Sequence, residues 1–157
     1  MVNGLDSPKL KRSLVQYLSV IMIFLLTAAC ATMQSRWKAA ERINTIEAYE
    51  EFLSIYPEGE LADRSRLKLE GLYFQGAKNT DTIEAYKNFL KLYPEGMHAK
   101  EARARLELLN FLKVERTNTI EAYESFLKLY PEGTLANKAR AKLELLNFLK
   151  VERTNTI

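Results

Sequence analysis

The sequence predicts an all-α protein made of tandem helical hairpins. A block of 37 residues recurs without a gap, and the fourteen residues at 107–120 reappear unchanged at 144–157. Each block holds two stretches with the apolar spacing of an amphipathic helix, and a Pro–Glu–Gly turn separates them. A period of this length is typical of stacked supersecondary units, in which each repeat contacts only its neighbours.

The first helix of each block should have one apolar face. In the first block this face is formed, at spacings of three and four, by Ile46, Tyr49, Phe52, Leu53 and Tyr56. Asn44 and Glu47 have the spacing of a capping box, and the pairs that repeat it are Asp81 with Glu84 and Asn118 with Glu121. The helix should end near Tyr56 because Pro57 disfavours helical geometry in the residue before it.

The turn and the second helix follow in the same order in each block. The turn glycines Gly59, Gly96 and Gly133 are expected to adopt backbone angles that other residues avoid. The second helix has small residues in its early turns and large apolar residues later: Ala62, Ser65, Leu69, Leu72 and Phe74 in the first block, and Ala99, Ala102, Leu106, Leu109 and Phe111 in the second. The small residues should let another helix approach closely, and the large ones should fill the core.

The repeat register divides the chain into segments. We expect a signal peptide at 1–29, a short tether at 30–36, a partial capping helix at 37–43, repeats at 44–80, 81–117 and 118–152 (together 44–152), and the start of a fourth repeat at 153–157. Trp37 falls in register with Phe74, Phe111 and Phe148, so residues 37–43 should cover the first hairpin as a terminal cap does. The other end has two interpretations. The chain is a truncated piece of a longer array, which we favour, or its uncapped hairpin docks onto something.

The first thirty residues have the order of a secretory signal. Lys9, Lys11 and Arg12 precede an apolar run that starts at Leu14, and small residues lead up to Cys30. The stretch Leu–Thr–Ala–Ala–Cys resembles the lipobox of bacterial lipoproteins. That resemblance implies removal of the signal peptide, attachment of a diacylglyceryl group to the cysteine thiol, and acylation of the new amino terminus. Two or three acyl chains hold a protein on a membrane essentially permanently.

Two other interpretations of this segment remain. Residues 14–31 could form an uncleaved transmembrane helix, although Gln16 and Ser19 leave an apolar core that fits a signal peptide better. Cys30 could instead be a buried structural cysteine. The lipoprotein interpretation also predicts a location: Ala31 stands where Asp commonly retains members of the family in the inner membrane, which favours the bacterial outer membrane, facing the periplasm.

A repeated pattern of small and aromatic residues carries a second resemblance. The pattern Ala–Tyr–x–x–Phe–Leu–x–x–Tyr–Pro–x–Gly–x–x–Ala–x–x–Ala occurs in full at 85–102 and 122–139, and nearly so at 48–65. It resembles tetratricopeptide repeats, and it is similar to the repeats of bacterial envelope proteins such as the lipoprotein of the outer-membrane β-barrel assembly machinery and the TolA-binding coordinator. The resemblance covers residues 45–152 and implies a short right-handed solenoid whose concave face holds peptides or partner proteins. The invariant step of 37 residues departs from the family, and no partner-contacting residue carries over.

Composition and charge exclude several classes of function. The chain has 23 basic and 20 acidic side chains, but Lys9, Lys11, Arg12 and Asp6 lie within residues 1–29, so 23 − 3 = 20 basic and 20 − 1 = 19 acidic residues remain, a formal charge of +1. A nearly neutral remainder without a basic run argues against nucleic-acid binding. A single cysteine and a single histidine exclude an internal disulfide and a two-histidine metal site.

The remaining candidate residues are expected to have structural roles. His98 holds the repeat position of Leu61 and Leu135, which indicates a tolerated edge position. Two tyrosine ladders at the repeat step indicate packing between helices: Tyr49, Tyr86 and Tyr123, and Tyr56, Tyr93 and Tyr130. Three acids at the repeat step could be mistaken for paired catalytic carboxylates, but their positions at helix starts give them a capping role: Glu47, Glu84 and Glu121. Glu101 and Arg105, one turn apart, are expected to form a solvated pair.

The sequence therefore predicts a non-catalytic scaffold of the bacterial envelope, with fatty acyl chains such as palmitate on Cys30 and with no cofactor or metal. Its partners would be the membrane, through the lipid, and an envelope protein of unidentified kind, but not nucleic acid. The alternative is a structural spacer or an array that self-associates through its uncapped C-terminal hairpin. A third hypothesis, an accessory or glycan-processing enzyme, has no nucleophile–base or metal constellation to support it.

Overall fold

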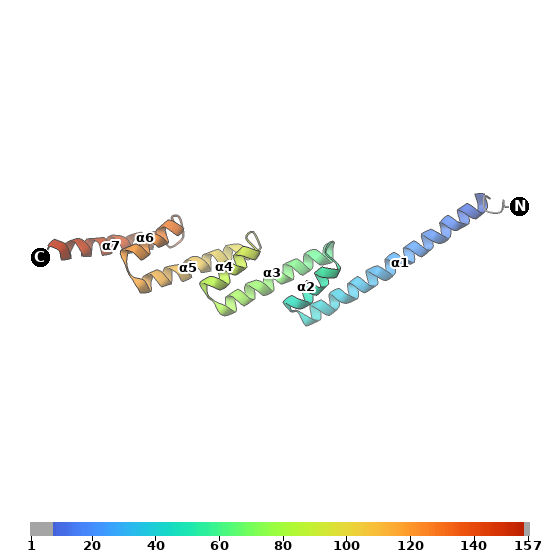
Figure 1. The fold of residues 1–157 in the computed structure, drawn as a ribbon, viewed down its shortest axis with the longest axis horizontal. Coiled ribbons are helices and arrows are strands. Elements are labelled where there is room, and N and C mark those ends of the chain that lie inside the picture. The colour runs from blue at the N-terminus through green and yellow to red at the C-terminus, as the bar shows by residue number, and fades with distance from the viewer. Residues whose placement is uncertain (1–7, 156–157) are drawn as a thin grey trace. The chain divides into compact units, whose positions relative to one another are not determined.

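The protein is all-α over the residues that the structure describes, as the sequence predicts. The computed structural model describes the backbone of residues 8–155 and the side chains of residues 14–23, 32–153 and 155. Its helices, coloured from blue to red along the chain in Figure 1, are α1 (Pro8–Ile43), α2 (Ile46–Ile55), α3 (Glu60–Thr80), α4 (Ile83–Leu92), α5 (Ala99–Thr117), α6 (Ile120–Leu129) and α7 (Ala136–Asn155). The chain divides into two compact units, residues 1–69 and 70–157, and the boundary falls inside α3.

In the first unit, the end of α1 packs on α2. Trp37 is 2% exposed, and its ring centroid lies 5.8 Å from that of Tyr49 and 5.6 Å from that of Phe52. The guanidinium carbon of Arg64 on α3 lies 5.6 Å from the centre of the indole ring, a distance at which a cation and an aromatic ring attract each other. Because a buried tryptophan removes a large apolar area from water, this contact fastens α1 to the first hairpin.

The second unit contains two aromatic cores that share four buried positions. The ring centroids of Phe74 on α3 and Phe89 on α4 lie 5.2 Å apart. Those of Phe111 on α5 and Phe126 on α6 lie 5.4 Å apart. The buried residues at matching repeat positions are Phe74, Tyr86, Phe89 and Ala102 in one core, and Phe111, Tyr123, Phe126 and Ala139 in the other. The alanine of each core is fully buried, which lets the second helix of the hairpin pack closely on the first.

Two helices extend across boundaries expected from the sequence. α1 runs without a break from Pro8 to Ile43, so the expected tether at 30–36 is helical. α7 continues to Asn155, so residues 153–155 belong to the second helix of the third hairpin and not to a fourth repeat. Residues 1–7 of the expected signal peptide and residues 156–157 lie outside the described residues. In the part of the chain that was described, no helix combines the length and the apolar character needed to cross a membrane.

The caps of the short helices lie one residue later than predicted. Each N-cap is a threonine whose hydroxyl accepts a hydrogen bond from the backbone N–H three residues further on; the three are Thr45, Thr82 and Thr119. The predicted caps Asn44, Asp81 and Asn118 instead have φ values of 52°, 49° and 49°. Their backbone N–H groups donate to the carbonyl four residues back, so they end the preceding helix. Asn and Asp tolerate this left-handed conformation better than most residues.

Each first helix ends where the proline requires, and an arginine then holds the turn. As predicted, α2 ends at Ile55, α4 at Leu92 and α6 at Leu129, and the capping tyrosine that follows directly precedes the proline. In each hairpin an arginine of the second helix donates a hydrogen bond to the proline carbonyl oxygen; the pairs are Arg66 with Pro57, Arg103 with Pro94 and Arg140 with Pro131. This repeated contact ties the second helix to its turn.

Candidate interaction surfaces

Two buried glutamates join neighbouring hairpins in the second unit. Glu70 on α3 and Glu107 on α5 are 6% and 7% exposed. The Glu70 carboxylate accepts a hydrogen bond of 2.8 Å from the backbone N–H of His98, and Glu107 accepts one of 2.8 Å from Leu135. These N–H groups lie at the starts of α5 and α7, where a helix leaves its first donors without a partner. Each glutamate therefore supplies the acceptor, and the favourable negative charge, that the second helix of the next hairpin needs.

The same glutamates account for two of the three turn glycines. A Cβ atom on Gly96 would lie 2.5 Å from Oε1 of Glu70, and one on Gly133 would lie 2.4 Å from Oε1 of Glu107. Gly59, in contrast, has a φ of 98° and open space around its Cβ position. The prediction of unusual backbone angles is correct for Gly59 and wrong for the other two, which instead leave room for a carboxylate.

The first hairpin lacks this glutamate and begins its second helix differently. Met33 holds the repeat position that Glu70 and Glu107 hold later in the chain. α3 begins at Glu60, two repeat positions earlier than α5 and α7. The turn before it uses the positive φ of Gly59. Where the preceding helix offers a carboxylate, the second helix therefore starts later, against that acceptor.

A groove on the second unit is lined by α3, α4, α5 and the junction between the first two. It has a volume of about 480 Å³, and its lining residues are Phe74, Lys78, Asp81, Tyr86, Glu101, Ala104, Arg105 and Leu108. Two ion pairs lie along it. Lys78 Nζ is 3.3 Å from Glu101 Oε1, and the Arg105 guanidinium contacts both carboxylate oxygens of Asp81, with Nε donating to Oδ1 at 2.8 Å. The groove thus combines apolar side chains with charges of both signs.

These ion pairs replace the pair predicted along α5. Glu101 forms an ion pair with Lys78, and Arg105 forms one with Asp81; both of these partners precede α4. The hydrogen bond from the Arg105 guanidinium lowers the pKa of Asp81, so this carboxylate stays charged at neutral pH. The matching positions of the other repeats hold Asn44 and Asn118, which carry no charge. The Asp81–Arg105 ion pair therefore belongs to the middle repeat.

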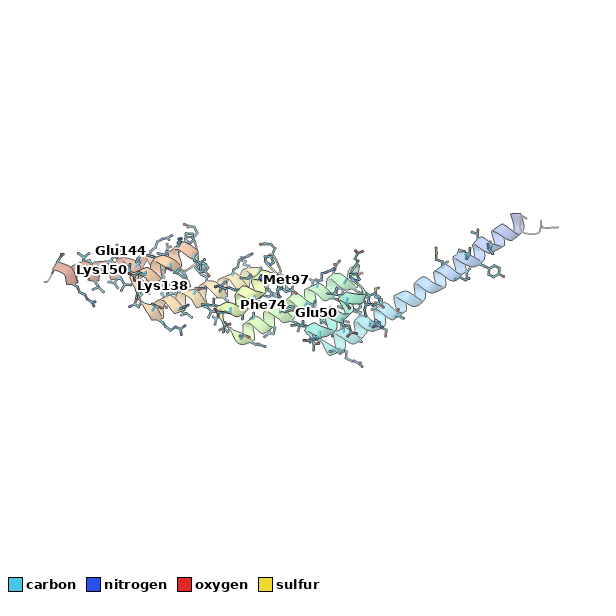
Figure 2. All side chains as sticks on the ribbon, viewed as in Figure 1. Glu50, Phe74, Met97, Lys138, Glu144 and Lys150 are labelled. Carbon is cyan, nitrogen blue, oxygen red and sulfur yellow. The ribbon has the colours of Figure 1, made fainter. Side chains whose placement is uncertain are left out.

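The next junction has its charges exchanged. Lys138 Nζ lies 2.9 Å from Glu115 Oε1 and 4.8 Å from the centre of the Phe111 ring. Lys78 and Glu115 share one repeat position, and Glu101 and Lys138 share another. Figure 2 labels Lys138 on α7 and Phe74 on α3. Exposed ion pairs of this kind contribute about 0.2–1 kcal/mol each to stability. We therefore infer that the reversed order of the two charges matters more for which hairpins fit together than for stability.

α7 presents a second surface, whose counterpart on α5 is buried. Phe148 is 59% exposed, whereas Phe111, at the same repeat position, is 1% exposed. Glu144, labelled in Figure 2, is exposed at the position of the buried Glu107. Three further large apolar side chains of α7 are exposed: Leu145, Leu149 and Val151. A hollow of about 340 Å³ lies nearby, between the start of α6 and the later turns of α7.

The histidine and the first tyrosine ladder are packed between helices. The His98 ring stacks on Phe74, with 4.5 Å between ring centroids and 6° between ring planes. Leu135, at the same repeat position, packs against the other core. The ladder tyrosines are buried, and burial is the main cause that raises the pKa of each: Tyr49, Tyr86 and Tyr123.

The remaining predicted residues fall at helix starts or outside the described side chains. Glu47, Glu84 and Glu121 are exposed in the first turns of α2, α4 and α6, where negative charge is favourable. Cys30 lies within α1, but its side chain is outside the described residues, so its lipidation stays a prediction. Among the side chains that are described, no three His, Cys, Asp or Glu residues gather in a way that could hold a metal ion.

Comparisons with known proteins leave the family open. No protein-family model matches the chain, and no curated protein is significantly similar to it in sequence.

Proposed function

We propose that the protein is a lipid-anchored scaffold of the bacterial envelope that binds another envelope protein and catalyses no reaction. Its hairpins would stack at a step of 37 residues into a short right-handed solenoid that resembles tetratricopeptide repeats. The observation that carries this proposal is the recurrence of one packing unit, because the same aromatic core and the same buried glutamate occur twice in the second unit. Stacked units of this kind create an extended surface suited to binding.

The groove at Asp81 and Arg105 is the surface that we assign to the partner. It presents Ala104 and Leu108 beside charges of both signs, a combination that suits a peptide or helix with apolar and charged side chains of its own. Its ion pair stands where the other repeats have asparagine. A chemically distinct groove within otherwise similar repeats is what selective binding requires.

The amino-terminal segment supports the anchoring part of the proposal. Between residues 14 and 23, every large apolar side chain is more than half exposed. A row of such side chains is unfavourable in water, and it suits the apolar segment of a signal peptide that inserts into the membrane before it is removed. Acylation of Cys30 would then hold the mature protein at the outer membrane, on its periplasmic side.

Site-specific photo-cross-linking in the native bacterium tests the proposal. A photoreactive side chain at Ala104, which is exposed in the groove, should give a discrete product with one envelope protein. The same side chain at Lys128, which is exposed on α6 outside the groove, is the matched control and should not give it. Adding Arg105→Ala should reduce the yield from Ala104 at least tenfold. Identical products from both positions, or none from Ala104, would contradict the assignment of the groove.

The exposed face of α7 favours a second candidate function, a structural spacer or self-associating array. Phe148 and its neighbours form an apolar surface of the kind that is buried elsewhere in the same unit.

A further inference from the structure

We propose that the exposed face of α7 is a docking site for a helix and turn of the repeat's own type. The occupant is an amphipathic helix that ends in Tyr–Pro–x–Gly and continues into a second helix with small residues in its early turns. The inference rests on the stacking proposed above, but it concerns a surface separate from the groove at Asp81 and Arg105.

Part of α7 repeats the sequence of α5. Residues 144–155 of α7 are letter for letter the same as residues 107–118. On α5 this sequence is covered by α6, the turn that follows α6 and the start of α7, and Phe111 is 1% exposed. On α7 the same sequence leaves Phe148 59% exposed. The chain itself therefore shows what fits this sequence when it is covered.

The covered copy defines three contacts. The Phe111 ring packs on Tyr123 and Phe126, with centroids 6.5 and 5.4 Å apart. The Glu107 carboxylate accepts the Leu135 backbone N–H at 2.8 Å. The Asn110 side-chain amide donates to the Tyr130 hydroxyl at 3.0 Å. On α7 the corresponding side chains are all exposed, and they are Phe148, Glu144 and Asn147.

These contacts specify the occupant. It must bring a tyrosine and a phenylalanine three positions apart to Phe148, and a tyrosine hydroxyl to Asn147. It must also bring a backbone N–H two residues after its turn glycine to Glu144. Glycine is expected at the turn because a Cβ there would crowd the glutamate oxygen, as one on Gly133 would lie 2.4 Å from Oε1 of Glu107. An ordinary amphipathic helix satisfies the apolar contact but not the other two.

A binding titration tests the inference with the full chain. The probe is a fluorescently labelled synthetic peptide with the sequence of residues 118–143, which contains every group named above. We expect saturable binding by fluorescence anisotropy. Phe148→Ala and Glu144→Ala should each weaken binding at least tenfold, whereas Lys142→Ala, an exposed substitution outside these contacts, should not change it.

A second peptide separates specific docking from simple apolar association. It carries alanine at the position of Gly133, and it should bind the unmodified chain at least tenfold more weakly than the parent peptide. Equal binding of the two peptides, unchanged binding by Phe148→Ala, or absence of saturable binding by the parent peptide would each overturn the inference. None of these results bears on cross-linking at Ala104, so the failure of this inference and that of the proposed function can be told apart.

Discussion

At the scale of single residues, the glutamate–glycine contact decides how one hairpin meets the next. A buried carboxylate is costly unless it is hydrogen-bonded. Glu107 meets this requirement by accepting the backbone N–H of Leu135, which directly precedes α7 and would otherwise lack an acceptor. One hydrogen bond therefore satisfies both the buried carboxylate and the backbone N–H at the start of the helix. It forms where the turn residue, Gly133, has no side chain to crowd the carboxylate.

Gly133→Ala should consequently lower the stability of the second unit. The added methyl would displace the Glu107 carboxylate and break its hydrogen bond, at a cost of about 1–3 kcal/mol. The matched control is Gly71→Ala on α3, where the added methyl meets open space. That control should be stabilising by about 0.5–1 kcal/mol, because alanine favours a helix interior more than glycine does.

Urea denaturation followed by far-ultraviolet circular dichroism measures both effects. The two variants should shift the unfolding midpoint in opposite directions from the unmodified chain. If Gly133→Ala is as stable as Gly71→Ala, the close approach of the carboxylate is not a real constraint on the turn.

At the scale of helices, the threonine caps make a separate contribution. The Thr119 hydroxyl accepts the Ala122 backbone N–H at 3.2 Å and satisfies a donor of the first turn of α6. Thr119→Ala should therefore destabilise the chain by about 1 kcal/mol. Thr119→Ser keeps the hydroxyl and should have a much smaller effect in the same denaturation experiment. A loss of equal size in both variants would mean that the hydroxyl is not the capping group.

The sequence was informative about helices because their determinants are local. Pro57 disfavours helical geometry in the residue before it, and the apolar spacing of three and four defines a face. The caps were misassigned by one residue because Asn44 and Thr45 are both good capping residues, and only the backbone angles separate them. Asparagine at a positive φ is as natural as asparagine at a cap.

The interaction surfaces were harder to predict because their determinants are tertiary. Glu70 looks like an ordinary solvent-facing acid until the turn at Gly96 is placed against it. A signal was present, since a glutamate recurs at the repeat step at 70, 107 and 144 among large apolar residues. The pairing of Arg105 with Asp81 gave no such signal. Glu101, four residues before Arg105 on the same helix, was an equally suitable partner for the arginine by sequence spacing.

At the scale of the whole molecule, the proposed function depends on one helix that carries both the anchor and the cap. Cys30 and Trp37 both lie on α1, seven residues apart, so their backbones are separated by about 10 Å at 1.5 Å per residue. Trp37 is buried against α2. If the cysteine is acylated, the first hairpin must therefore lie close to the membrane surface.

Cys30→Ala should abolish this attachment completely. We expect the unmodified chain to incorporate labelled palmitate in bacterial cells and to lose residues 1–29, whereas the variant should incorporate no label and keep its full length. Thr27→Leu is the matched control, since leucine is the commonest lipobox residue at that place; it should preserve both labelling and processing. Sodium dodecyl sulfate gels with autoradiography report label and length together.

The same gels distinguish lipid attachment from an uncleaved transmembrane anchor. An anchor formed by residues 14–31 would need no cysteine, so Cys30→Ala would remain membrane-bound and of the same length as the unmodified chain, and neither would carry label. A lipoprotein gives a shorter, labelled product that requires the cysteine. Because α1 is continuous across residue 30, removal of residues 1–29 would leave the new amino terminus on the same helix as Trp37. The mature chain should therefore keep the contact of Trp37 with α2 after cleavage.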